Sequence, residues 1–151
     1  MCRYTDKACE LFASDCNCAQ AVFAAFADRM GMDEVTALKL SSSFGGGMGR
    51  LREVCGAVSG MFMVAGALYG YDYNDDEKKK AHYELIQRMA ESFKEKHGTI
   101  ICRELLELGE GASAPTPSPR TAEYYSSRPC IRFVETAAEI TEELIKSKEN
   151  K

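Results

Sequence analysis

The chain has few histidines and no CxxC motif. Its two histidines, His82 and His97, lie in a strongly charged stretch, where solvated side chains are more common than metal ligands or catalytic bases. Without CxxC, the sequence carries neither the signature of a thioredoxin-type enzyme nor that of a zinc knuckle. No Ser/His/Asp set and no isolated pair of carboxylates stands out, so hydrolytic chemistry has no support in the sequence.

An excess of positive charge is also missing, because the formal net charge is -4. A nucleic-acid-binding domain normally shows a basic face, so we expect no nucleic-acid partner. The opening residues, MCRYTDKACELF, carry charges where a signal peptide needs an apolar stretch, which favours a cytoplasmic location. The uncharged run 54–71 just reaches the length of a membrane span, but its four glycines favour a buried core helix, and we expect no membrane partner.

Strand signals are absent as well, and apolar residues recur at helical spacing along most of the chain. The length of 151 residues and the 45% hydrophobic and 28% charged fractions fit one globular domain, residues 1–151. We predict an all-α, single-domain helical bundle with a buried central helix rich in small residues. The expected helices cover residues 5–30 with a break near Ser14 and Asp15, 33–43, 53–69, 75–96, 99–108 and 129–146. The oligomeric state stays open.

Two segments rich in glycine interrupt this pattern. Residues 109–127, GEGASAPTPSPRTAEYYSS, are longer than a compact domain usually tolerates in a loop, so we expect a flexible excursion, with a functional lid as the alternative. Residues 44–60, FGGGMGRLREVCGAVSG, contain neither a Walker motif nor the dinucleotide-binding pattern. Glycines before a helix can present N–H groups to an anion. A tight structural turn at Gly45, Gly46 and Gly47 is nevertheless the favoured interpretation.

Arg50 and Arg52 follow these glycines and precede Cys55. They could stabilise a nearby thiolate or receive an anionic substrate. Such residues are more often surface cations beside a turn, so neither is assigned a catalytic role.

Seven cysteines are many for a chain expected in a reducing compartment, where structural disulfides are rare. Four of them lie in the predicted first turns of four helices, with Asp15, Thr99 and Pro129 among the start signals: Cys18, Cys55, Cys102 and Cys130. A helix start offers unpaired N–H groups and a partial positive charge, which would stabilise a thiolate and lower its pKa. If the four helix starts converge, four anionic sulfurs would share one site.

The other cysteines, Cys2, Cys9 and Cys16, recur every seven residues. Two helical turns separate successive members by about 10.5 Å, which is too far for a disulfide. We interpret them as packing or incidental residues, with Cys2 exposed at the terminus, and their role stays open.

The stretch CGAVSG, residues 55–60, matches the CGAxxG motif of the C_GCAxxG_C_C family of putative redox-active proteins, which four cysteines define. The sequence also resembles this family at NCAQ (17–20), CREL (102–105) and RPC (128–130). The resemblance implies a redox role for Cys18, Cys55, Cys102 and Cys130. It assigns Gly56, Ala57 and Gly60 to the motif, and it implies no particular reaction or substrate.

Three functions remain in competition. In the first, the four cysteines bind an iron–sulfur cluster for electron transfer with an unidentified redox partner, and a Cys₄ zinc site is the redox-silent form of this prediction. In the second, two of the four form a reversible disulfide in a thiol–disulfide oxidoreductase or redox sensor. In the third, the chain is a non-enzymatic structural or interaction domain with packed, inert thiols and no cofactor.

Overall fold

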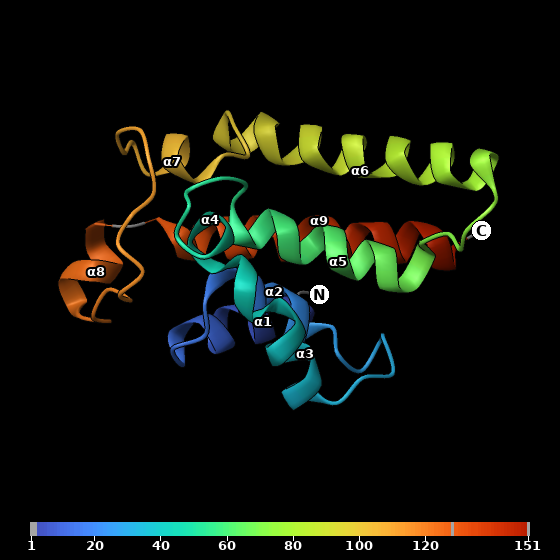
Figure 1. Ribbon diagram of the computed structural model, residues 1–151. Helices are drawn as coiled ribbons and strands as arrows, with labels where there is room; N and C mark the ends of the chain where they lie inside the picture. Colours follow the sequence, from blue (N-terminus) through green and yellow to red (C-terminus); the bar gives the residue numbers. More distant parts are fainter. Residues whose placement is uncertain (1–2, 128, 151) are drawn as a thin grey trace.

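The computed structural model describes residues 3–127 and 129–150, and these residues form an all-α bundle (Figure 1), as predicted. No strand occurs in the described residues, where the β-type pairing consists of an isolated antiparallel bridge between Val54 and Ile101. The elements are α1 (Arg3–Ala13), α2 (Cys18–Ala25), α3 (Glu34–Ser41), η1 (Ser42–Phe44), α4 (Gly45–Met48), α5 (Gly56–Tyr69), α6 (Asp76–His97), α7 (Cys102–Leu105), α8 (Ala122–Ser127) and α9 (Cys130–Glu149).

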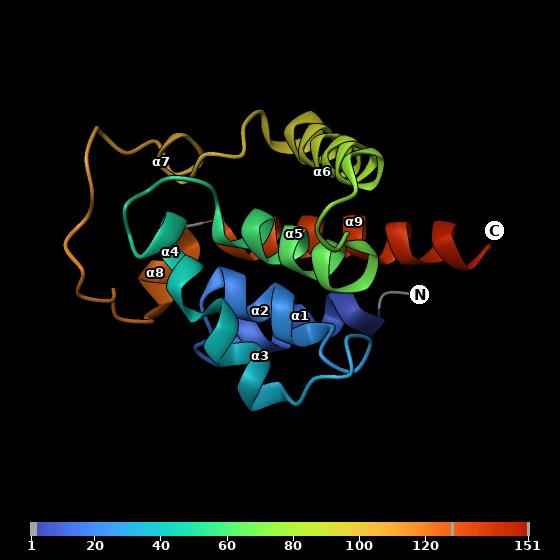
Figure 2. The ribbon, with the colours of Figure 1, turned by 45° about the vertical axis from the view of Figure 1, so that its right-hand side comes forward.

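Helix α5 lies at the centre of the bundle. It packs against α2 and α9, while α1 packs on the same two helices, and α6 runs along the opposite side over α5 and α9 (Figures 1 and 2). The largest fully buried side chains come from several of these helices: Phe12, Phe26, Met61 and Phe93. The apolar faces of the helices therefore meet in one core, as a layered helical domain requires.

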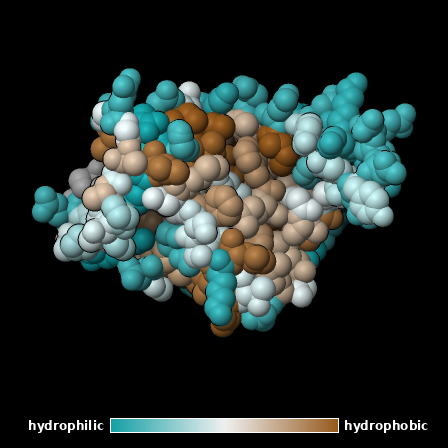
Figure 3. Space-filling view, viewed as in Figure 1, coloured by the Kyte–Doolittle hydropathy of each residue, from teal (hydrophilic) through white to brown (hydrophobic). Residues whose placement is uncertain are grey.

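The prediction of a fully buried central helix holds for only the first half of α5. Residues 56–61 are buried, but Gly66 and Ala67 are exposed, and the surface over this helix is tan to brown in Figure 3. The reason is the length of its neighbour: α2 has 8 residues against 14 in α5, so it covers only the first turns. No described helix is long and apolar enough to cross a membrane.

Several helix starts differ from the predictions. The N-cap of α2 is Asn17 rather than Asp15, because Asn17 and Gln20 form a reciprocal capping box. Asp15 instead has a left-handed backbone, with φ of 76°. Asp33 caps α3 and Asp75 caps α6, and α6 is followed by the left-handed Gly98 at its C-terminal end.

The predicted helix 99–108 contracts to the single turn of α7, because the residues before it pair with the segment that precedes α5. The predicted loop 109–127 ends earlier than expected, since α8 occupies its last residues.

Candidate functional site

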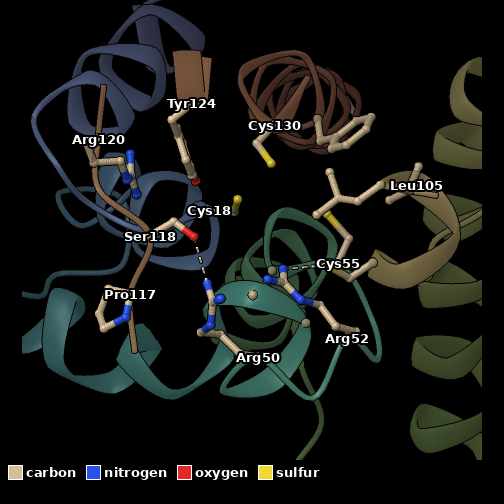
Figure 4. A pocket seen from close by; sticks show the side chains of 16 residues that line it. Cys18, Arg50, Arg52, Cys55, Leu105, Pro117, Ser118, Arg120, Tyr124 and Cys130 are labelled. Atoms are coloured by element: carbon tan, nitrogen blue, oxygen red, sulfur yellow. Dashed lines mark hydrogen bonds between the residues drawn. The ribbon is translucent and has the colours of Figure 1, made fainter. Parts of the chain in front are cut away.

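Cys18, Cys55, Cys102 and Cys130 line one cavity of about 130 Å³ (Figure 4). Each cysteine stands at or directly before a helix: three are the first residues of α2, α7 and α9, and Cys55 is the N-cap of α5. The fold thus brings together residues that lie far apart in the sequence. The half-buried Cys9 and Cys16 do not line this cavity, and Cys2 lies outside the described residues.

The positions of Cys55 and Cys102 depend on one short antiparallel pairing. The N–H group of Cys55 donates to the carbonyl of Ile100 at 2.7 Å, and the N–H group of Cys102 donates to the carbonyl of Glu53 at 2.6 Å. Val54 and Ile101 lie opposite each other between these bonds. Two reciprocal backbone hydrogen bonds therefore fix the two cysteines relative to each other.

The glycine-rich segment before Cys55 is a left-handed turn. Five consecutive residues, 46–50, have φ between 63° and 69°. A Cβ atom on Gly47 would lie 2.6 Å from Cys102 Cβ and 2.8 Å from Arg52 Cα, so this position needs glycine for space as well as for conformation. The turn uses its own carbonyls as acceptors for the following N–H groups, including the bond from Glu53 N–H to Gly47 O at 2.9 Å. This geometry agrees with a structural turn.

The small residues of the CGAxxG motif bring α5 close to α2. A Cβ atom on Gly56 would lie 3.2 Å from Cys18 Cβ, and one on Gly60 would lie 3.0 Å from Ala19 O. Ala57 between them is fully buried. Gly45 also adjoins this contact, since a Cβ atom there would overlap the Asn17 side chain. Close packing of the two helices is therefore what holds Cys18 beside the start of α5.

The Cys18 thiol interacts with Cys130, and the side-chain hydrogen bond between them is the largest cause of the raised pKa of Cys18. In Figure 4 both side chains point into the same space. Residues 3–127 and 129–150 contain no group of three or more His, Cys, Asp and Glu side chains arranged to hold a single metal ion. The four thiols share a cavity, then, without closing around one point.

A family model described as "Putative redox-active protein (C_GCAxxG_C_C)" matches residues 16–144. The chain belongs to the C_GCAxxG_C_C family. The matched region contains all four cysteines of the cavity and excludes Cys2 and Cys9. No curated protein and no solved structure matches the chain. Family membership supports a redox-active protein and names no reaction.

The electrostatics of this C_GCAxxG_C_C site differ from the prediction of stabilised thiolates. Burial raises the pKa of the Cys55 thiol to about 12, and the N–H groups of Val58 and Ala57 offset only part of this effect. The hydrogen bond with Cys130, together with burial, holds the pKa of the Cys18 thiol well above its usual range. The expected lowering was wrong for these two thiols because loss of water outweighs the helix-end N–H groups.

Arg52 is the main feature of the site that the sequence did not reveal. Its side chain is not a surface cation: Arg52 is 2% exposed, its Nη1 donates to Cys102 Sγ at 3.6 Å, and its Nε donates to Ser113 Oγ at 2.8 Å. No carboxylate forms an ion pair with it within the described part of the chain. Nothing in the local sequence distinguishes Arg52 from an exposed arginine, since its burial depends on the pairing of its segment with residues 100–103.

The loop predicted as a flexible excursion contributes to the cavity wall. Pro117, Ser118 and Arg120 line the cavity together with Tyr124 of α8 (Figure 4). The arginines attach this loop to the site: Arg50 Nε donates to the carbonyl of Ala114 at 2.6 Å and Arg103 Nη2 to that of Gly111 at 3.2 Å. Arg120 lies over the rings of Phe12 and Tyr124 and donates to the carbonyl of Cys16. The loop therefore forms part of the wall of the site, which is the position that a functional lid would need.

Proposed function

We propose that this chain is an electron-transfer protein in which Cys18, Cys55, Cys102 and Cys130 bind an iron–sulfur cluster as thiolates. The observation that carries the proposal is the composition of the cavity wall. Four cysteines and three arginines line it, and the described lining residues include no carboxylate and no histidine. Cysteine-only ligand sets are typical of iron–sulfur clusters. The rest of the wall is mostly apolar or glycine, with Leu105, Leu106 and Phe133 among its members.

The charge balance of the site supports the same proposal. A site with four thiolates is strongly anionic, and Arg52 offers a buried positive charge that has no carboxylate partner within the described residues. The N–H groups of Ala57 and Val58 act to lower the pKa of the Cys55 thiol, so they favour a thiolate there. Because the thiols of Cys18 and Cys55 hold their protons tightly, iron must displace these protons to bind, which couples loading to pH.

The placement of the four thiols in the wall of one cavity, with no three of the described side chains grouped for a single ion, fits a cluster better than zinc. A structural zinc ion needs four ligands around one centre, with each sulfur about 2.3 Å away. The described residues contain no such grouping. In a cluster the thiolates bind different irons, so sulfurs that are spread around one cavity suit it better. When bound, a cluster would supply one-electron transfer, while the chain's own residues keep water out and fix the surrounding charge.

The experiment that tests the proposal is a measurement of iron, acid-labile sulfide and zinc, with a visible spectrum, on protein purified without oxygen. We expect iron and sulfide in the wild type and neither in a variant with all four cavity cysteines changed to serine. A Cys9→Ser/Cys16→Ser double variant is the matched control, because these half-buried thiols lie off the cavity, and it should load normally. Zinc alone, or no metal after reconstitution, would refute a cluster.

A second candidate function is supported by the hydrogen bond between the Cys18 and Cys130 thiols. Two adjacent thiols can pass two electrons and two protons to a partner disulfide, forming their own S–S bond while the partner becomes a dithiol. Oxidised protein would then be lighter by two hydrogens and would yield a crosslinked peptide joining Cys18 to Cys130. A Cys18–Cys130 disulfide in metal-free protein, together with its reduction by a dithiol partner, would favour the oxidoreductase. Unreactive thiols without metal would instead favour the structural domain.

A further inference from the structure

Arg52 is held in one orientation by the backbone around it. Its N–H group donates to the carbonyl of Gly46 at 3.3 Å, and its own carbonyl accepts from Arg103 N–H at 3.3 Å. Arg52 also has a left-handed φ of 64°, an unfavourable conformation for a residue with a side chain. The fold therefore tolerates local strain at the residue that directs a guanidinium at Cys102.

The neighbouring arginines are engaged differently. Arg103 Nη1 lies 3.6 Å from a carboxylate oxygen of Glu53, and Arg120 Nε lies 3.7 Å from one of Asp15, so both have negative partners. Arg50 donates to the carbonyl of Ala114 and to Ser118 Oγ in the loop. Among the described residues, only Arg52 combines near-complete burial with a hydrogen bond to a cavity sulfur and no carboxylate.

We propose that Arg52 is a positioning residue whose guanidinium is the built-in counter-ion of the cysteine site and raises its reduction potential. This inference rests on the proposed cluster function. When a reduced partner gives one electron to the site, the site becomes more negative by one charge, with no bond made or broken. A fixed, buried cation next to Cys102 stabilises the reduced state more than the oxidised state.

The same residue links the sulfur site to the loop. Arg52 Nε donates to Ser113 Oγ while Nη1 donates to Cys102 Sγ, so one planar group bridges the two. A lysine at position 52 would keep the positive charge, but it could not bridge Cys102 and Ser113 with one planar group. The charge and the geometry can therefore be separated by comparing two substitutions.

The test compares Arg52→Gln and Arg52→Lys with Arg103→Gln, which removes a loop-anchoring arginine that has no contact with sulfur. We expect Arg52→Gln to lower the midpoint potential by at least about 59 mV, which corresponds to a tenfold change in the one-electron equilibrium constant. The midpoint potential of Arg52→Lys should lie closer to that of the wild type than to that of Arg52→Gln. Arg103→Gln should change the one-electron equilibrium constant by less than about twofold. A cluster-loaded Arg52→Gln protein with an unchanged potential would overturn the proposal. If that variant binds no cluster, a loaded lysine variant near the wild-type potential supports the role, and a lysine variant that also fails to load overturns it.

A second readout does not depend on electron transfer. In metal-free protein Arg52 has no carboxylate partner among the described residues, so Arg52→Gln should lower the unfolding temperature no more than Arg103→Gln does. In loaded protein, Arg52→Gln should speed the loss of iron to a chelator at least tenfold relative to Arg103→Gln. Equal destabilisation of both states would show a merely structural role. Wild-type protein without iron and sulfide would overturn the proposed function and this role together, whereas a wild-type cluster unaffected by the glutamine variant would overturn the role alone.

Discussion

Gly47 offers the sharpest test of how the glycine turn builds the site. A Cβ atom at this position would lie 2.6 Å from Cys102 Cβ, 2.8 Å from Arg52 Cα and 2.8 Å from Glu53 N, in a residue with φ of 69°. Gly47→Ala therefore adds a methyl group where one wall of the cavity is formed, and it does so in a conformation that disfavours any side chain.

The size of the effect follows from two costs. A non-glycine residue in the left-handed region costs about 1 to 2 kcal/mol, and forcing an extra methyl group into a packed site costs about 1 to 3 kcal/mol. We expect Gly47→Ala to lower the free energy of unfolding by about 2 to 5 kcal/mol in total. Gly49→Ala is the matched control, because Gly49 has φ of 63° but the nearest atom, Ser43 O, would be 3.8 Å from the new methyl group. It should show only the conformational cost.

Urea unfolding of the metal-free wild type and both variants measures these costs. Iron content after reconstitution then reports whether Cys102 is still in place. We expect Gly47→Ala to lose iron binding and Gly49→Ala to retain it. The reasoning fails if the two alanine variants are equally stable and load equally, since the contact with Cys102 would then have no energetic weight.

Two further predictions concern α5. Gly60→Ala should destabilise the protein by about 1 to 3 kcal/mol, because the new methyl group would lie 3.0 Å from Ala19 O. Gly66→Ala should stabilise the protein by about 0.5 to 1 kcal/mol, because no atom lies within 4 Å of the new methyl group and alanine favours a helix more than glycine does. Thermal unfolding of both variants checks the opposite signs. Because burial raises the pKa of the Cys55 thiol from 9.0 to about 12, folded metal-free protein binds this proton more tightly than unfolded protein does. Its stability contribution is complete below the unfolded pKa and should fall by about 1.4 kcal/mol per pH unit as the pH rises toward 12. In urea titrations at several pH values the slope of Cys55→Ala should be shallower than that of the wild type by this amount, while the contribution of Cys18 remains.

The sequence predicted the helices well because their periodicity and caps are local properties. Asp33, Asp75 and Gly98 mark helix ends through interactions within a few residues of themselves. The start of α2 was placed wrongly because Asp15 and Asn17 are both good caps by composition. A local pattern decides between them, because only Asn17 has a glutamine three residues on, Gln20, that completes a capping box; Asn17 Nδ2 also donates to the carbonyl of Ser42.

The meeting of the four cysteines could be anticipated from helix starts and from the family motif, but the raised pKa values of the Cys18 and Cys55 thiols could not. A helix end lowers a thiol pKa only where water or cations remain to solvate the thiolate, and the amount of burial is a property of the assembled core. Cys55 shows this directly: the N–H groups of Ala57 and Val58 act to lower its pKa, yet burial raises it.

In metal-free protein the raised thiol pKa values keep negative charge out of the site, whereas the buried Arg52 would be stabilised by negative charge there. Neutral thiols cannot compensate the positive charge of Arg52, and the pKa values of Cys18 and Cys55 stay raised despite this cation. Binding iron would resolve both, because each metal–thiolate bond replaces a proton and leaves a net negative site beside the guanidinium. Loading should therefore release protons, strengthen with rising pH and protect the fold. The same arrangement without metal favours neutral, slowly reacting thiols, which sets a kinetic barrier to disulfide chemistry at this cavity.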